Sequence, residues 1–180
     1  MLFSLILACT NEGGIGINNS IPWTIRDEML LFKRITSYAN GSNDKKNAVI
    51  MGRKTWESLP YKPLKNRINI IITSNPSLIN TNDVFVFKSF DEGLEFCDIN
   101  TNINKVFVIG GKSLYDLCLD NEKYLNKIES IHLSIIKQKY NCDTHINLKK
   151  IIKTFNKYNI NDIIFNSNFI HIKYLSNSNK

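Results

Sequence analysis

Apolar segments of strand length recur along the chain, and several are continuous runs of Val, Ile and Phe. Such runs are typical of strands that are covered on both faces of a sheet. The predicted strands cover residues 4–9, 48–51, 69–73, 84–87, 106–109, 131–136, 163–165 and 169–175. The last three alternate between apolar and polar residues, and the turn residues Asn166, Ser167 and Asn168 predict a closing antiparallel hairpin.

Amphipathic segments between the early strands predict helices at 26–38, 54–59, 92–97 and 113–119. Thr24-x-x-Asp27 resembles a capping box, with Asp27 as the capping residue, and Ser89 with Glu92 forms a second one. Strands that alternate with helices predict one α/β domain over residues 1–175. It has a mostly parallel sheet of eight strands, a C-terminal antiparallel hairpin and about four flanking helices. The polar residues 176–180 are predicted to fray.

Composition narrows the class of protein. The chain has 180 residues, 43% hydrophobic and 22% charged, which excludes disorder for most of it and fits a single domain. Its 23 Lys and Arg against 16 Asp and Glu give a net charge of +7, which attracts anions. The basic residues are scattered rather than gathered into an arm. We therefore expect small anions such as dinucleotides as ligands, and neither nucleic acid nor a membrane as partner.

Cysteine and histidine usage indicates a cytoplasmic protein without a metal. Cys9, Cys97, Cys118 and Cys142 form no C-x-x-C motif, so we expect unpaired thiols in a reducing compartment. The three histidines have no metal-ligand spacing. The apolar segment at 1–9 is too short for a membrane span and lacks the basic start of a signal peptide, so we expect a buried strand.

Three predicted strands are each followed by residues that are suited to binding a phosphate group. They are followed by Gly110-Gly111-Lys112-Ser113, by Gly52-Arg53-Lys54-Thr55 and by Thr73-Ser74-Asn75. Glycines let backbone N–H groups approach a phosphate, and a helix N-terminus favours its charge. An isolated Gly-Gly is also compatible with an ordinary tight turn, and the Rossmann fingerprint is absent. The three segments together predict a dinucleotide site at one edge of the sheet.

Glu28 is the acidic residue whose position is unusual. It shares a helix face with Leu31, Phe32 and Ile35, which are all apolar. Burial on that face would raise the pKa of the Glu28 carboxyl and make it a proton donor or a ligand anchor. The alternative is a solvated acid in the first helical turn. Upstream, the glycine-rich residues 13–20 are compatible with a mobile lid or with a plain surface loop.

These segments, in this order, resemble dihydrofolate reductase of the eukaryotic, protozoan or viral kind. The matching motifs are Gly-Ile-Gly at 14–16, Ile-Pro-Trp at 21–23, Asp-Glu-x-x-x-Phe-Lys-Arg at 27–34, Val-Ile-Met-Gly-Arg-Lys-Thr-Trp-Glu-Ser at 49–58, Pro-Leu-x-x-Arg at 63–67, Asn-Ile-Ile-Ile-Thr-Ser at 69–74, Val-Ile-Gly-Gly at 108–111 and Asp-Thr-His at 143–145. The resemblance implies reduction of dihydrofolate to tetrahydrofolate by hydride transfer from NADPH.

The resemblance also implies roles for single residues. Glu28 would hold the pterin and support protonation of its ring nitrogen, Trp23 would order a water, and Ser134 would replace the usual Thr beside the acid. Arg67 would bind the glutamate carboxylate of the substrate. The other substrate residues implied are Ile6, Met29, Phe32, Leu59, Lys62, Leu64, Ile109 and Tyr115.

For the cofactor, the resemblance implies a nicotinamide region, a phosphate region and a cis peptide between Gly110 and Gly111. The cofactor residues implied are Ala8, Ile15, Gly16, Asn18, Asn19, Ser20, Gly52, Arg53, Lys54, Thr55, Thr73, Ser74, Lys88, Gly110, Gly111, Lys112, Ser113, Leu114 and Tyr115.

Some features depart from the family or leave alternatives open. Cys142 stands where members of the family carry Gly or Ser, and this change should alter the mobility of the loop. Residues 40–46 form a polar insert. The protein is expected to be a monomer that binds dihydrofolate and antifolates, unless it is the front half of a fusion with thymidylate synthase. The alternatives are the reductase of riboflavin synthesis, which would lack the Glu28 and Trp23 patterns, a basic nucleic-acid-binding module, and a catalytically silent homologue.

Overall fold

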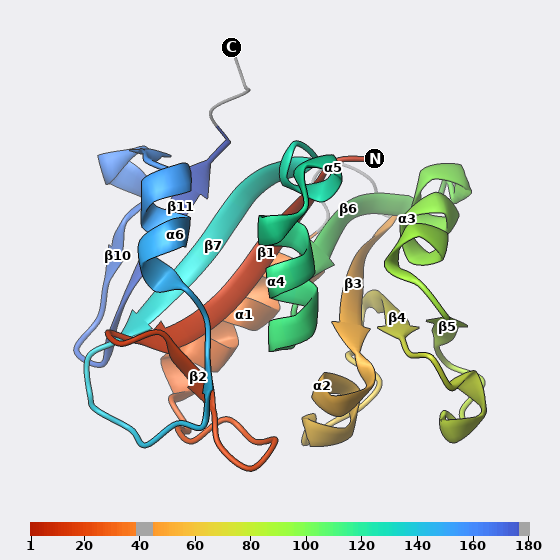
Figure 1. The fold of residues 1–180 in the computed structure, drawn as a ribbon, viewed down its shortest axis with the longest axis horizontal. Helices are drawn as coiled ribbons and strands as arrows, with labels where there is room; N and C mark the ends of the chain where they lie inside the picture. The colour runs from red at the N-terminus through yellow and green to blue at the C-terminus, as the bar shows by residue number, and fades with distance from the viewer. Residues whose placement is uncertain (39–44, 177–180) are drawn as a thin grey trace.

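The computed structural model describes residues 1–38 and 45–176, and these form one α/β domain (Figure 1). The strands are β1 (Phe3–Thr10), β2 (Gly14–Gly16), β3 (Lys46–Gly52), β4 (Arg67–Ile72), β5 (Phe85–Phe87), β6 (Ile103–Val108), β7 (Ile128–Ile136), β8 (Thr144–His145), β9 (Lys157–Tyr158), β10 (Ile164–Phe165) and β11 (Phe169–Leu175). The α-helices are α1 (Arg26–Ser37), α2 (Arg53–Ser58), α3 (Phe90–Ile99), α4 (Lys112–Asp120), α5 (Glu122–Leu125) and α6 (Leu148–Thr154). Short 3₁₀ turns cover Pro76–Leu78 and Ile160–Asp162.

The main sheet has the strand order β10-β11-β7-β1-β6-β3-β4-β5. The neighbours from β7 to β5 are parallel, whereas β11 is antiparallel to β7 and to β10. The eight predicted strands and the closing hairpin are confirmed. A short ninth strand, β9, pairs with β11, and β2 and β8 form a separate two-stranded sheet that the sequence pattern did not indicate.

Alternate residues of the central strands enter two apolar layers. On one face, Leu5, Ile50 and Val108 join the main core with residues of α3, α4 and α6. On the other face, Ile6 and Met51 belong to a second cluster, against which side chains of α1 and α2 pack. In Figure 1, α4 lies in front of the sheet and α1 behind it. Helices on both faces explain why the central strands are continuously apolar.

Two predictions about helix starts have different outcomes. Ser89 does cap α3, because its hydroxyl accepts from the backbone N–H of Glu92 at 3.2 Å. The capping box of α1 is wrong: Ile25 occupies the cap position, which has no side-chain hydrogen bond. Asp27 lies inside the first turn, and its carboxylate accepts from the Asn166 amide at 3.0 Å instead. Thr24 stands one position too early to serve as the cap.

Further predictions concern the C-terminal tail, the polar insert and a membrane span. Ser176 is not frayed, because it is buried and its N–H donates to the carbonyl of Glu129 at 3.1 Å. The rest of the predicted tail, 177–180, and most of the polar insert, 40–44, lie outside the described residues. In the portion that is described, no helix has the length and apolarity needed to cross a bilayer.

Candidate functional site

The strands β3 and β6 end side by side, and each is followed by a helix. The N–H of Gly52, at the end of β3, donates to the carbonyl of Gly110 at 2.8 Å, and the N–H of Ile109 donates to Ile50 at 2.9 Å. The peptide bond between Gly110 and Gly111 is cis. Thus the first turns of α2 and α4 open onto the same sheet edge, where sequence reasoning placed two of the three phosphate segments.

Gly110 is favoured by its positive φ and by close packing, and Gly111 is closely packed. Gly110 has a φ of +110°, and a Cβ there would lie 3.0 Å from the Tyr115 hydroxyl oxygen. A Cβ on Gly111 would lie 3.1 Å from the Thr55 hydroxyl oxygen. Among the described residues no side chain caps α4, so its first N–H groups remain available to an anion.

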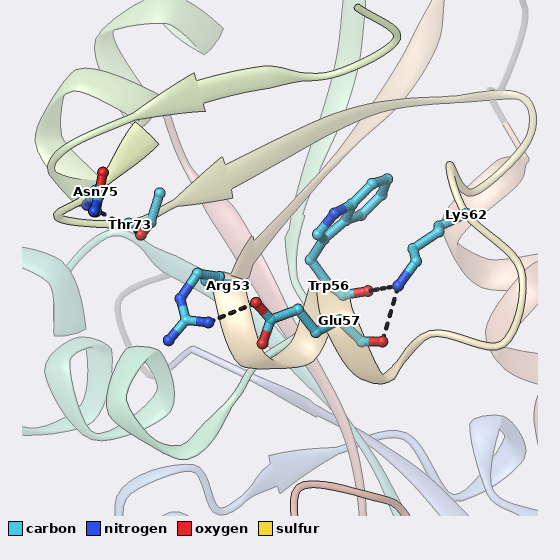
Figure 2. Close-up of polar contacts among 6 residues, drawn as sticks. All are labelled: Arg53, Trp56, Glu57, Lys62, Thr73 and Asn75. Carbon is cyan, nitrogen blue, oxygen red and sulfur yellow. Dashed lines mark hydrogen bonds and ion pairs between the residues drawn. The ribbon is translucent and has the colours of Figure 1, made fainter. Parts of the chain in front are cut away.

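The third phosphate segment follows β4, which pairs with β3. Figure 2 shows the Thr73 hydroxyl, which accepts from the N–H of Asn75 at 3.2 Å, and the Arg53 guanidinium, which pairs with Glu57 at 2.5 Å. The remaining predicted cations are exposed, and Lys112 pairs with Asp116 one turn along α4 at 2.5 Å. Lys54, Ser74, Lys88 and Ser113 are exposed and Thr55 is partly buried, while Leu114 belongs to the main core.

The predicted apolar substrate residues come together for the most part. Ile6 and Ile109 are buried in the second cluster, and Phe32, Leu59 and Leu64 pack against it from α1 and the segment after α2. Met29 is 47% exposed and is absent from that cluster. The cluster therefore forms an apolar wall between α1 and the sheet, beside the glycine pair.

Arg67 begins β4 and lies against α1. Its Nη1 donates to the Thr36 hydroxyl at 2.8 Å, its Nε donates to the Lys65 carbonyl at 3.0 Å, and its guanidinium carbon lies 5.9 Å from the centre of the Phe32 ring. Burial lowers the pKa of Arg67, which nevertheless stays charged. The two bonds use two of its five N–H donors, so the guanidinium is oriented with donors to spare.

Lys62 has a local structural contact. Its ammonium donates to the carbonyls of Trp56, at 3.2 Å, and Glu57, at 2.9 Å, at the C-terminal end of α2 (Figure 2). The ammonium also lies 5.6 Å from the centre of the Trp56 ring. A cation at this end complements the helix dipole. These contacts hold the Lys62 ammonium at the C-terminal end of α2.

Glu28 lies partly buried on α1, and burial raises the pKa of its carboxyl. A hydrogen bond from the Ser134 hydroxyl opposes that shift. Ser134 is on β7 directly opposite Ala8 of β1, and the buried Trp23 packs in a cluster that includes Leu31 and touches Ala8. The pKa of the buried Tyr115 hydroxyl is also raised, chiefly by burial and in part by the Glu28 charge. Of the two alternatives for Glu28, the structure favours the withdrawn carboxyl over the fully solvated one, because the side chain is partly buried and burial raises its pKa.

The segment after β1 is tied to the segment before β8. Ile17 and Ser20 exchange two backbone hydrogen bonds of 2.9 Å around Asn18 and Asn19, which both have positive φ. The N–H of Asn18 donates to the Asp143 carboxylate at 2.8 Å. Ile15 and Gly16 belong to β2, which pairs with β8. Cys142 packs against Gly14, where a Cβ would lie 2.6 Å from its sulfur atom.

Several supporting residues escaped the sequence reasoning. Asn69, which is buried, accepts from the N–H of Leu64 at 2.9 Å and donates to the carbonyls of Leu64 and Arg67. Thr36 orients Arg67, and His171 contacts Ser134 at 3.1 Å. The one available signal was a polar residue inside an apolar strand, which burial makes costly unless it is hydrogen-bonded.

Comparison of the sequence with known proteins shows to which family the chain is similar. A family model described as dihydrofolate reductase matches residues 2–171. The chain is 41% identical over 156 residues to the dihydrofolate reductase of Pneumocystis carinii. The matched region covers 81% of this chain and 74% of that protein. It is 36% identical over 146 residues to that of Heliothis virescens, over 78% of the chain and 76% of the relative. The bifunctional dihydrofolate reductase-thymidylate synthase of Paramecium tetraurelia is 38% identical over 153 residues, which are 85% of the chain and 29% of that protein.

Proposed function

Because the chain belongs to the dihydrofolate reductase family, we propose that it reduces 7,8-dihydrofolate to 5,6,7,8-tetrahydrofolate with NADPH as the reductant. The observation that carries the proposal is the partly buried Glu28 carboxyl, whose pKa is raised by burial and which lies on the same helix as Phe32 of the apolar wall. Across the C6–N5 double bond of the pterin, carbon 6 gains a hydride and nitrogen 5 gains a proton. NADPH supplies the hydride when it is bound.

Glu28 anchors the pterin and supports the proton transfer. An ionised carboxylate accepts hydrogen bonds from the amino group and ring N–H of the pterin. Its raised pKa brings protonation closer to neutral pH, as acid catalysis needs. Ser134 donates to the carboxylate, and the buried Trp23 holds the water through which the proton reaches nitrogen 5.

The apolar wall and Arg67 bind the rest of the substrate. Ile6, Phe32 and Ile109 contact the ring systems together with Leu59 and Leu64, and Met29 lies at the open side. Arg67 binds the glutamate carboxylate of the substrate, and its guanidinium is already oriented by Thr36 and the Lys65 carbonyl. Preorganisation lowers the entropy cost of that contact. In this proposal Lys62 acts indirectly, because it stabilises the end of α2 beside Leu59.

The glycine pair fits a dinucleotide phosphate. A Cβ on either glycine would press on Tyr115 or Thr55, so the backbone must approach closely there, and the start of α4 offers uncapped N–H groups at Lys112 and Ser113. Arg53, Lys54, Thr55, Thr73, Ser74 and Lys88 would hold the remaining phosphates, including the 2′-phosphate of NADPH. Ala8 and the segment at 15–20 would cover the nicotinamide and exclude water.

The test is the loss of NADPH absorbance when the purified protein is mixed with dihydrofolate, with NADH as a parallel control. We expect rapid oxidation with a preference for NADPH. If the folded protein binds NADPH but does not oxidise it when dihydrofolate is added, it is instead a riboflavin-type reductase or a silent homologue. Absence of cofactor binding would overturn the assignment of the sheet edge between Gly52 and Gly111.

We further propose a cytoplasmic monomer that also binds antifolates. The relatives include both separate reductases and bifunctional reductase-thymidylate synthases, and this chain matches 29% of the length of one bifunctional relative. Light scattering of the purified chain measures its oligomeric state and so tests the proposal that it is a monomer. A dimer would contradict it.

A further inference from the structure

The side chain of Asn47 holds the C-terminal end of α1 against the sheet. Asn47 lies on β3 and is fully buried. Its amide nitrogen donates to the Thr36 carbonyl at 3.1 Å and to the Tyr38 carbonyl at 2.9 Å. Its amide oxygen accepts from the amide nitrogen of Asn104, on β6, at 3.0 Å. The side chain therefore uses both of its donor hydrogens and its acceptor, and it joins α1 to two strands.

These bonds satisfy backbone groups at a helix end. The last carbonyls of an α-helix have no donor within the helix, and a buried polar group without a partner destabilises the fold. Asn47 donates to two carbonyls at this end from a neighbouring strand. Because both donor hydrogens belong to one planar amide group, the amide of Asn47 fixes where the end of α1 lies over β3.

Thr36 is the residue through which this end of α1 meets Arg67. Asn47 and Arg67 are register partners on the parallel strands β3 and β4, so their side chains lie on the same face of the sheet. The Thr36 hydroxyl donates to the Phe32 carbonyl at 2.8 Å, and its oxygen accepts from Nη1 of Arg67, also at 2.8 Å. Asn47 thus holds the backbone of the residue whose hydroxyl orients the Arg67 guanidinium.

We propose that Asn47 is a positioning residue of the substrate site: it fixes the end of α1 so that the Thr36 hydroxyl directs the Arg67 guanidinium toward the glutamate carboxylate of the substrate. This role rests on the proposed function, in which Arg67 binds that carboxylate. It differs from a general stabilising role, because a hydrogen bond lost elsewhere in the fold leaves the guanidinium oriented. The effect of losing Asn47 is therefore confined to the part of a ligand that reaches Arg67.

The first test is fluorescence titration of Asn47→Ala with two matched inhibitors, one with a glutamate tail and one without it. We expect the tailed inhibitor to bind about 3- to 10-fold more weakly, the size of one ordinary hydrogen bond, and the other to bind almost as before. KM for dihydrofolate should rise by a similar factor while kcat stays nearly constant. Ser130→Ala is the matched control, since it removes the buried hydrogen bond of 2.8 Å between Ser4 and Ser130. It should destabilise the fold without changing the ratio of the two affinities.

A double-mutant cycle tests whether Asn47 acts through Thr36. Thr36→Val removes the hydroxyl and keeps the shape of the side chain, so it should also weaken binding of the tailed inhibitor. Adding Asn47→Ala should then cost little more. Additive losses, or equal losses for the two inhibitors in Asn47→Ala, would overturn the proposal and leave Asn47 a role in stability alone. If Asn47→Ala does not fold, Asn47→Ser leaves one donor at the site, and the same outcomes are read from it.

A measurement on the free protein separates the role of Asn47 from the proposed function. Nitrogen NMR of the Arg67 guanidinium, with Arg67→Leu to identify the signals, reports how fast the group rotates. The bond to Thr36 should keep this rotation slow in the unaltered protein, and Asn47→Ala should make it several-fold faster, whereas Ser130→Ala should not. Unchanged rotation in Asn47→Ala would overturn the proposal even in an active reductase. Should the protein lack reductase activity, the rotation would still decide whether Asn47 orients Arg67.

Discussion

Glu28 and Arg67 are charged side chains that are partly withdrawn from water beside the same apolar wall. Burial shifts the pKa of each toward the neutral form, upward for Glu28 and downward for Arg67. The two residues differ in their support, because Arg67 donates to Thr36 and to a backbone carbonyl, whereas the rise in the pKa of Glu28 is opposed only by the Ser134 hydroxyl. Their replacement should therefore have different consequences.

Glu28→Gln is expected to keep the fold and NADPH binding while lowering turnover at neutral pH by about 100-fold or more, because the acid is lost. Its effect on stability has a definite sign. The folded pKa is raised, so the folded protein binds more protons than the unfolded chain above the ordinary glutamate pKa, and ionisation of Glu28 destabilises the fold as pH rises. In urea unfolding, the free energy of unfolding of Glu28→Gln should therefore increase relative to that of the unaltered protein as the pH is raised from 4 to 7. Unchanged turnover would remove Glu28 from the mechanism.

Arg67→Leu should weaken binding of folate and of inhibitors that carry a glutamate tail by about 10- to 100-fold, the loss of one or two charge-assisted hydrogen bonds. Inhibitors without that tail should bind almost as before, since they do not reach the guanidinium. Fluorescence titration with a matched pair of inhibitors measures both affinities. Equal losses for the two inhibitors would mean that Arg67 acts through its contacts with Thr36 and Phe32.

At the scale of elements, the turn between β6 and α4 is the junction on which the proposed cofactor site depends. It touches the turn between β3 and α2 through the Gly52–Gly110 hydrogen bond, and Tyr115 of α4 reaches back to donate to the Ile6 carbonyl at 2.8 Å. The junction thus connects both sheet faces, and its geometry leaves little room for added atoms.

Gly110→Ala should lower the free energy of unfolding by about 2–4 kcal/mol, because its positive φ is strained for alanine and the new Cβ would meet the Tyr115 ring. Gly52→Ala is the matched control. A Cβ at Gly52 would be no closer than 3.9 Å to its neighbours and φ is −76°, so we expect a loss below about 1 kcal/mol. Urea denaturation of both variants measures the difference. Similar losses would show that packing around Gly110 is looser than the structure indicates.

At the scale of the whole molecule, the main sheet holds two histidines away from water, His171 of β11, which is buried, and His132 of β7, which is partly buried. His132 lies 6.1 Å from Phe107 and 5.7 Å from His171 between ring centres, and both imidazoles are kept neutral by burial. The unfolded chain, in contrast, protonates its histidines near pH 6.5. This difference makes global stability depend on pH.

We expect stability to fall as pH drops from 6.5 toward 4, because the unfolded chain then binds protons that folded His132 and His171, with pKa values of about 3 and about 4, do not. Each histidine contributes a slope of at most about 1.4 kcal/mol per pH unit. Urea unfolding at pH 6.5, 5.5 and 4.5 should show a shallower slope in His132→Leu. An identical slope would mean that His132 is already protonated in the fold or still neutral in the unfolded chain.

The amino-acid sequence by itself determined the features that depend on neighbours along the chain. The length and apolarity of the strand segments, the helical face with Leu31, Phe32 and Ile35, and the glycine pair are local patterns. They predicted the eight strands in the main path of the sheet and the helices α1 to α4, but not the short strands β2, β8 and β9 or the helices α5 and α6. The burial of Glu28 follows from the same local pattern, because one face of α1 must cover the sheet.

The tertiary structure decided the features that join distant segments. Thr36 and Arg67 are 31 residues apart, and Ser134 and His171 are 37 apart, so strand register and helix docking bring them together. Lys62 turns to the end of α2, and Asp27 binds Asn166 instead of capping α1, because in each case a suitable partner lies within reach once the chain is folded. A hydrogen bond depends on the separation of two atoms in space, and no periodicity along the chain encodes that separation.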